Sequence, residues 1–107
     1  MPLHESLRRY ELLLPLVFND GRAVPEKLLA DTRHELRVRF GAISTETQAI
    51  RGEDDDTGGV NDQMVRVFID VPDTEDNHKF FRKLKERLKR RFKQEEIWII
   101  THLVERL

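Results

Sequence analysis

The residues with the clearest chemical potential are a dense run of cations between Lys79 and Lys93. Nine lysine or arginine residues lie in this stretch, and Glu86 is the one acid among them. Cationic groups at this density can bind the phosphates of nucleic acid without reading its sequence. They are equally typical of the solvated outer face of an ordinary helix. Both interpretations stay open, and the candidate polyanion-binding residues are Arg82, Lys83, Lys85, Lys89, Arg90 and Lys93.

A second candidate group lies in two apolar segments, residues 63–71 and 97–103. Alternation along a strand places every second side chain on the same face. That face carries large apolar side chains, which indicate a partner when they are exposed, and a few polar groups, which are typical of a small-molecule pocket. The candidate ligand or interface residues are Met64, Arg66, Phe68, Trp98, Ile100 and His102.

No motif in the chain predicts a catalytic centre, a metal site or a cofactor. The four histidines lack the spacing of a metal-binding helix, and the absence of cysteine excludes thiolate chemistry and disulfides. The acidic run from Glu53 to Asp56 lacks the alternating ligands and terminal glutamate of a calcium-binding loop. We therefore assign no catalytic and no metal-binding residues, and the chain is interpreted as non-enzymatic.

Length and composition predict one domain over residues 1–107, with residues 1–9 as a lead-in that is open to fraying. A net charge of −1 gives no general attraction to polyanions. The sequence shows neither a signal peptide nor an apolar stretch of roughly 20 residues that could span a membrane. We therefore expect a cytoplasmic protein that does not associate with membranes.

Two helices are predicted, and both have recognisable ends. The first opens at Pro25 and ends before Gly41, a residue that favours the left-handed conformation of a helix cap. The second, the basic helix 74–94, can be capped by Asp73 or Thr74. Four apolar residues recur at every fourth position of this helix, and Phe81 widens the stripe; they are Phe80, Leu84, Leu88 and Phe92. Each helix is therefore expected to pack by one face.

Four strands are predicted around these helices, over residues 10–18, 43–51, 63–71 and 97–103. Residues 52–62 are acidic and rich in glycine, and are expected to form the loop of a long hairpin. The order strand, helix, strand, strand, helix, strand predicts an α+β fold of the ferredoxin-like βαββαβ plan. Such a domain has a four-stranded antiparallel sheet with two helices on one face.

Three short motifs at element ends connect this chain with known domains. They are Asn19-Asp20-Gly21, Arg39-Phe40-Gly41 and Arg91-Phe92-Lys93-Gln94-Glu95. With these motifs the chain resembles a family of small bacterial ferredoxin-like domains of unknown function. The resemblance implies a fold and no activity.

Two helices cover only one face of such a sheet, so the outward side chains of a monomer should be polar. In the predicted strands both alternating sets are largely apolar, which indicates that something covers the second face. We predict a homodimeric binding or regulatory module that associates through this face. The alternatives are a small-molecule enzyme with a pocket on the same face, and nonspecific binding of nucleic acid by the basic helix.

Overall fold

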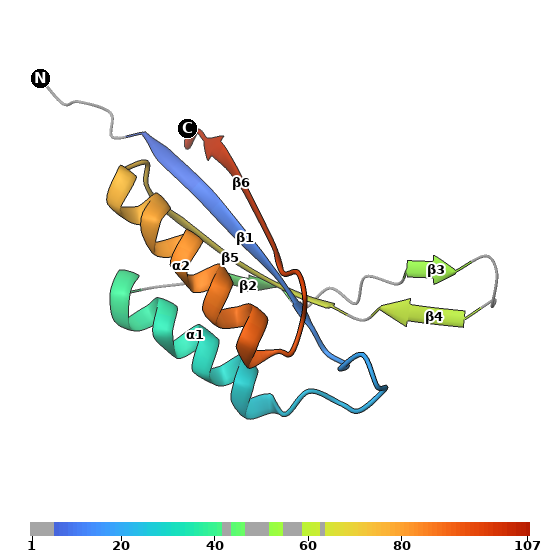
Figure 1. Cartoon of the computed structure of the whole chain (residues 1–107). Helices are drawn as coiled ribbons and strands as arrows, with labels where there is room; N and C mark the ends of the chain where they lie inside the picture. The colour runs from blue at the N-terminus through green and yellow to red at the C-terminus, as the bar shows by residue number, and fades with distance from the viewer. Residues whose placement is uncertain (1–5, 42–43, 47–51, 55–58, 63) are drawn as a thin grey trace, which may run out of the picture.

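The computed structural model of the chain describes residues 6–41, 44–46, 52–54, 59–62 and 64–107. Two helices lie side by side on one face of an antiparallel sheet (Figure 1). In chain order the elements are β1 (Leu7–Pro15), α1 (Glu26–Phe40), β2 (Ser44–Glu46), β3 (Gly52–Asp54), β4 (Gly59–Asp62), β5 (Met64–Pro72), α2 (Glu75–Arg91) and β6 (Trp98–Val104).

The main sheet has the strand order β2-β5-β1-β6, and each neighbouring pair is antiparallel. In the middle of β1, Tyr10 lies opposite Ile69 of β5 and Thr101 of β6. Strands β2 and β6 form the two edges. Strands β3 and β4 pair with each other as a separate sheet, which extends beyond the end of the main sheet where β5 begins (Figure 1).

The core lies between the main sheet and the helices. Its most buried residues come from β1 and β5, from both helices and from the residue after α2: Tyr10, Leu12, Leu14, Leu29, Leu36, Val65, Val67, Ile69, Val71, Phe81, Leu84, Leu88 and Phe92. Every second residue of β1 and β5 belongs to this group, as the period of a strand requires. The intervening residues therefore lie on the face of the sheet that is turned away from the helices.

Both predicted helices are confirmed. Helix α1 ends before Gly41, whose φ of 88° is left-handed and whose backbone N–H donates to the Arg37 carbonyl at 2.8 Å. Helix α2 is capped by Thr74, whose hydroxyl accepts a hydrogen bond from the Asn77 backbone N–H at 3.2 Å. Its buried stripe includes Phe81, whereas Phe80 is only partly buried.

The predicted ferredoxin-like plan of six elements is wrong for this chain. The described residues form eight elements, because segments 52–54 and 59–62, predicted as loop, are strands of a second sheet. Only β1, β5 and β6 are long, at seven to nine residues, while β2 has three. Strands β3 and β4 contain one apolar residue, Val60, so they are held by backbone hydrogen bonds and give no hydrophobic alternation to detect.

The first strand also begins earlier than predicted. Strand β1 starts at Leu7, inside the expected lead-in, and ends at Pro15, three residues before the predicted end at Phe18. Arg8 and Arg9 lie within it because carboxylates of neighbouring segments pair with both, Asp73 with Arg8 and Asp70 with Arg9. Pro15 ends the strand, which agrees with its lack of a backbone N–H. Of the second predicted strand, residues 47–51 lie outside the described residues.

Candidate functional site

We use the term open face for the side of the main sheet that is turned away from the helices. It is formed by Leu7, Arg9, Glu11 and Leu13 of β1, Met64, Arg66, Phe68 and Asp70 of β5, and Trp98, Ile100, His102 and Val104 of β6. All six residues predicted as a ligand or interface site therefore lie together on this face. In register, Leu13 lies between Arg66 and Trp98, and Glu11 lies between Phe68 and Ile100.

The apolar part of the open face is most exposed on β6. Trp98 is 61% exposed and Ile100 is 45% exposed, which are high values for large apolar side chains in a folded domain. Phe68 and Leu13 beside them are partly buried. Strand β6 is an edge strand, so Trp98 and Ile100 have a neighbouring strand on one side alone. The exposed apolar surface of the open face is therefore largest at the β6 edge.

A charged network occupies the other part of the open face. Asp70 accepts two hydrogen bonds from Arg9, from Nε at 2.7 Å and from Nη2 at 3.0 Å, and a third from Arg106 Nη2 at 3.2 Å. The hydrogen bonds from Arg9 lower the pKa of Asp70, because they stabilise the ionised carboxylate. The Arg9 guanidinium also lies over the Phe68 ring, at 4.6 Å from its centroid. These contacts hold the side chains of Arg9, Asp70 and Phe68 together on the open face.

The second ion pair of the open face is looser. Arg66 Nε lies 3.7 Å from Glu11 Oε2, a distance beyond that of a hydrogen bond. The same Nε atom is buried and has no hydrogen-bond partner in the described part of the chain. A buried N–H donor without a partner costs stability, so this pair is incompletely satisfied in the single chain.

The expectation that both alternating sets of side chains are apolar is wrong for the first strand. Tyr10, Leu12 and Leu14 face the core, but the opposite set includes Arg9 and Glu11. Sequence reasoning missed Arg9, Glu11 and Asp70 as residues of the candidate site. The signal was available for Arg9 and Glu11, because both alternate with the buried set once β1 is extended back to Leu7.

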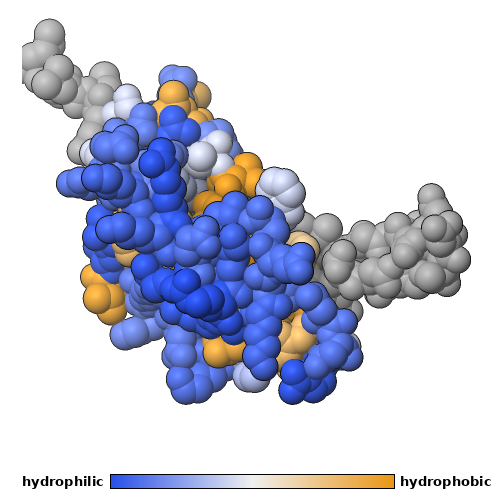
Figure 2. Space-filling model, viewed as in Figure 1, coloured by the Kyte–Doolittle hydropathy of each residue, from blue (hydrophilic) through white to orange (hydrophobic). Residues whose placement is uncertain are grey.

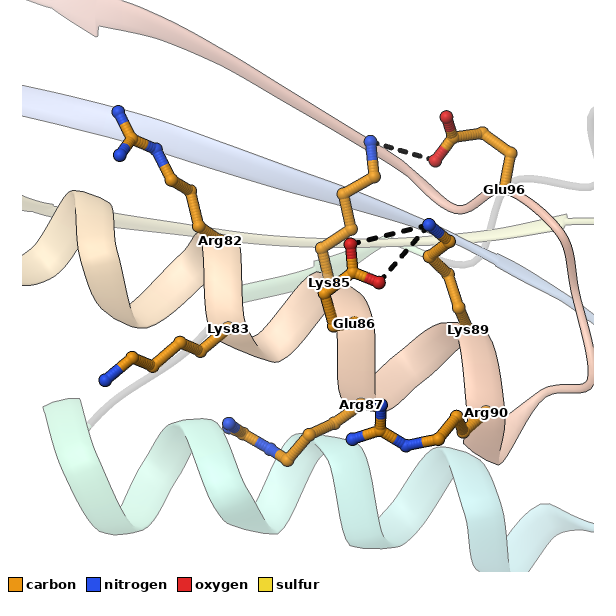
Figure 3. A pocket seen from close by; sticks show the side chains of 8 residues that line it. All are labelled: Arg82, Lys83, Lys85, Glu86, Arg87, Lys89, Arg90 and Glu96. Atoms are coloured by element: carbon orange, nitrogen blue, oxygen red, sulfur yellow. Dashed lines mark hydrogen bonds and ion pairs between the residues drawn. The ribbon is translucent and has the colours of Figure 1, made fainter.

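The basic surface of α2 is partly neutralised by acids of the chain itself. Arg87 and Arg91 both pair with Glu35 of α1, the latter at 3.0 Å, so they join the two helices. Figure 3 shows two further pairs, Lys85 with Glu96 at 2.9 Å and Lys89 with Glu86 at 3.3 Å. These contacts reduce the charge that is available to a phosphate backbone.

Four cations of α2 make no ion pair within the described residues: Lys79, Arg82, Lys83 and Arg90. Lys93, beyond the end of the helix, lies 5.5 Å from the centroid of the Phe18 ring. Of the six predicted polyanion-binding residues, Arg82, Lys83, Arg90 and Lys93 therefore make no ion pair with the residues that the structure describes. Binding of nucleic acid by this surface stays a prediction.

The described residues bear on two predicted absences, those of a metal site and of a membrane-spanning segment. In this part of the chain, no group of three or more His, Asp or Glu side chains is arranged to hold a metal ion. No helix in the same residues has the length and apolar character needed to cross a membrane.

Comparison with known proteins gives a likeness of fold. No family model matches the chain, and no curated protein matches it. Among solved structures, the chain is similar to a phage SAM lyase in complex with S-methyl-5'-thioadenosine, with a TM-score of 0.65 and 15% sequence identity. The likeness covers 99% of this chain and 95% of the lyase chain. The protein is thus a small α+β domain with the same overall fold as that structure.

Proposed function

We propose that the protein is a homodimeric binding module that associates through the open face of its main sheet. The observation that carries this proposal is the exposure of Trp98 and Ile100 beside Phe68 and Leu13, on a face that no helix of the described chain covers. Large apolar side chains that are exposed next to one another, as Trp98 and Ile100 are, are typical of a contact site. Covering it with a second copy removes the exposed rings and aliphatic groups from water.

The charges of the open face favour a second copy over a strongly charged partner. The face carries two internal ion pairs, Arg9 with Asp70 and Arg66 with Glu11. In a twofold dimer the same surface meets itself, so a face dominated by one sign of charge would repel its partner. Paired charges avoid this repulsion. Exclusion of water from the loose Arg66 and Glu11 pair would also strengthen their attraction.

The size of the face sets the expected strength of the dimer. Three long strands of seven to nine residues span roughly 30 Å by 15 Å at ordinary strand spacings. A standard protein–protein interface buries about 800 Å² of accessible surface on each partner, so the area of this face corresponds to a small interface. We therefore expect a dimer that dissociates on dilution.

The test is the molar mass in solution, measured by sedimentation velocity across a dilution series. Wild type is compared with Trp98→Asp, which places a charge at the centre of the proposed interface. The matched control is Leu103→Asp. Leu103 lies on the same strand and is 59% exposed, against 61% for Trp98, but it lies on the helix side of the sheet.

We expect a dimeric mass for wild type and Leu103→Asp, and a monomeric mass for Trp98→Asp, with the circular dichroism spectra unchanged. A wild-type protein that is monomeric at every concentration overturns the proposal. Equal loss of the dimer in both variants also overturns it, because the interface would then not be confined to the open face.

A second candidate function is a small-molecule enzyme that uses the open face as a pocket. The observation in its favour is the likeness over nearly the full chain to a structure described as a phage SAM lyase. SAM carries a sulfonium cation, and Glu11 and the exposed Trp98 ring are groups that attract cations. Of the residues predicted for this pocket, Arg66 and His102 lie on the same face as Trp98.

Incubation with SAM tests this candidate, with consumption followed by chromatography. Binding of S-methyl-5'-thioadenosine is measured in parallel by the shift in melting temperature. The candidate predicts consumption of SAM and a melting shift that Trp98→Asp abolishes and Leu103→Asp retains. An intact SAM pool together with an unchanged melting temperature contradicts it and leaves the dimer proposal untouched.

A further inference from the structure

A hollow on the helix side of the main sheet lies between α2 and the edge strand β6. Its lining residues come from β1, α2 and β6: Tyr10, His78, Phe81, Arg82, Lys85, Ile99 and Thr101. Its volume is about 180 Å³. Figure 2, which views the molecule from the helix side, shows hydrophobic residues between the hydrophilic surface of α2 and β6. The hollow lies on the opposite side of the sheet from the open face, so it is independent of the proposed dimer.

The inner wall of the hollow is apolar. Phe81 lies between two parallel rings, Tyr10 at 3.9 Å between centroids and Phe40 at 5.6 Å, so its edge lines the hollow and can meet the face of another ring. Tyr10 and Phe81 are both 2% exposed and packed into the core, so their positions are fixed. Ile99, which is partly buried, adds an aliphatic surface from β6. This wall suits the face of a single ring, since pockets that bury a larger, drug-sized ligand usually hold about 300–1,000 Å³.

A polar side chain at the wall can donate a hydrogen bond to a ligand. The Tyr10 hydroxyl lies 3.3 Å from His78 Nδ1. Burial raises the pKa of Tyr10, so the phenol keeps its proton at neutral pH and can donate it to Nδ1. A neutral histidine that accepts at Nδ1 carries its proton on Nε2, which is then a donor. Thr101 Oγ1 accepts a hydrogen bond from Arg8 Nη1 at 3.4 Å and its side chain also hydrogen-bonds to Tyr10, so Thr101 holds the Tyr10 hydroxyl in place.

Positive charge gathers on the α2 side of the hollow. Arg82 has no ion-pair partner within the described residues, and Lys85 shares its charge with Glu96 at 2.9 Å. Figure 3 shows the Arg82 and Lys85 side chains on the β6 side of α2, whereas Arg87 and Arg90 extend toward α1. Two acids near the start of α2, Asp73 and Glu75, lie close enough to contribute to the raised pKa of Tyr10. Asp73 is itself paired with Arg8 at 2.8 Å. The lining residues themselves include no acid.

We propose that this hollow binds a small organic anion that consists of one aromatic ring and a phosphate or carboxylate group. The ring would lie against Phe81 and Ile99. The anionic group would accept hydrogen bonds from Arg82 and from the His78 side chain. Arg82 is the residue that makes the site selective for anions, because its guanidinium makes no ion pair within the described part of the chain and can bind two oxygens at once.

Phenyl phosphate is the probe that tests this proposal. Its binding to the full chain is followed by the movement of backbone amide resonances in nuclear magnetic resonance titrations. Benzylamine, with the same kind of ring and the opposite charge, and inorganic phosphate, without a ring, are the two comparison probes. We expect phenyl phosphate to shift the amides of Ile99 and Thr101, and to bind at least tenfold more tightly than either comparison probe.

The matched variants are Arg82→Gln and Arg90→Gln. Both arginines lie on α2 and lack an ion pair within the described residues, but Arg90 does not line the hollow. We expect Arg82→Gln to weaken phenyl phosphate binding about tenfold or more, as loss of one charged hydrogen bond implies, and Arg90→Gln to leave it unchanged. Absence of binding, equal affinity for inorganic phosphate, or equal weakening in both variants overturns the proposal.

Discussion

The two faces of the main sheet differ in the burial and the polarity of their side chains. On the helix side, Leu12, Val67 and Leu84 are fully buried, and the set of buried residues there is almost entirely hydrophobic. On the open face, the exposed Trp98 and Ile100 share the surface with charged pairs such as Arg9 and Asp70. The helices of the same chain thus bury the core residues on the helix side. The open face leaves large apolar side chains in water, as surfaces that bind another molecule often do.

The largest difference between the faces is expected for truncation of a core residue. Leu12 is fully buried, so Leu12→Ala leaves a cavity and should lower the free energy of unfolding by about 2–5 kcal/mol. Urea denaturation of wild type and variant measures this loss. A loss below about 1 kcal/mol would mean that the helix side is packed far more loosely than its burial implies.

A smaller loss is expected from the charged network of the open face. Asp70→Asn weakens the hydrogen bonds from Arg9 and Arg106, and should cost about 1–3 kcal/mol at neutral pH. The pKa of Asp70 in the folded protein lies below its ordinary value of 3.8. Its contribution is therefore complete above pH 3.8, and is lost as the pH falls through the lowered pKa.

The measurement for this prediction is the stability to urea as a function of pH. Wild type should lose more stability than Asp70→Asn when the pH falls below about 3.8. Asp31→Asn is the control, because Asp31 pairs with Lys27 at an exposed position of α1 and its replacement should change little. Parallel pH profiles for wild type and Asp70→Asn would contradict a stabilising role of this network.

The smallest change is expected for Ile100→Ala when the protein is dilute. About half of the Ile100 side chain is already in water, at 45% exposure, so its truncation in a monomer should cost about 1 kcal/mol. The loss should grow with protein concentration, because the proposed dimer would bury this side chain. Denaturation at low and high protein concentration measures the difference. A cost that is independent of concentration would contradict burial of Ile100 by a second copy.

The fold could be predicted only where burial leaves a pattern in the sequence. Helix α2 was found because Leu84, Leu88 and Phe92 repeat at helical spacing and Thr74 caps the start. Strand β5 was found because Val65, Val67, Ile69 and Val71 alternate. Strands β3 and β4 contain no such alternating apolar set, and backbone pairing leaves no signal in the choice of side chains.

The candidate sites also include some features that a local sequence pattern predicts and others that it does not. The common face of Arg66, Phe68 and Trp98 follows from the period of a strand. The ion pair of Arg9 with Asp70 was missed, because it joins residues 61 positions apart in a segment expected to be a lead-in. The hollow beside Tyr10 depends on the position of α2 above β6, which no local pattern specifies.

The central claim is that a second copy covers the open face, and Trp98 reports on this directly because it is the only tryptophan of the chain. The measurement is the emission maximum of its fluorescence through a dilution series, with Leu103→Asp measured beside wild type. We predict emission at shorter wavelength in concentrated protein, where the partner shields the indole, and a shift to longer wavelength on dilution. An emission maximum at long wavelength at every concentration would show that Trp98 stays in water and would contradict the account.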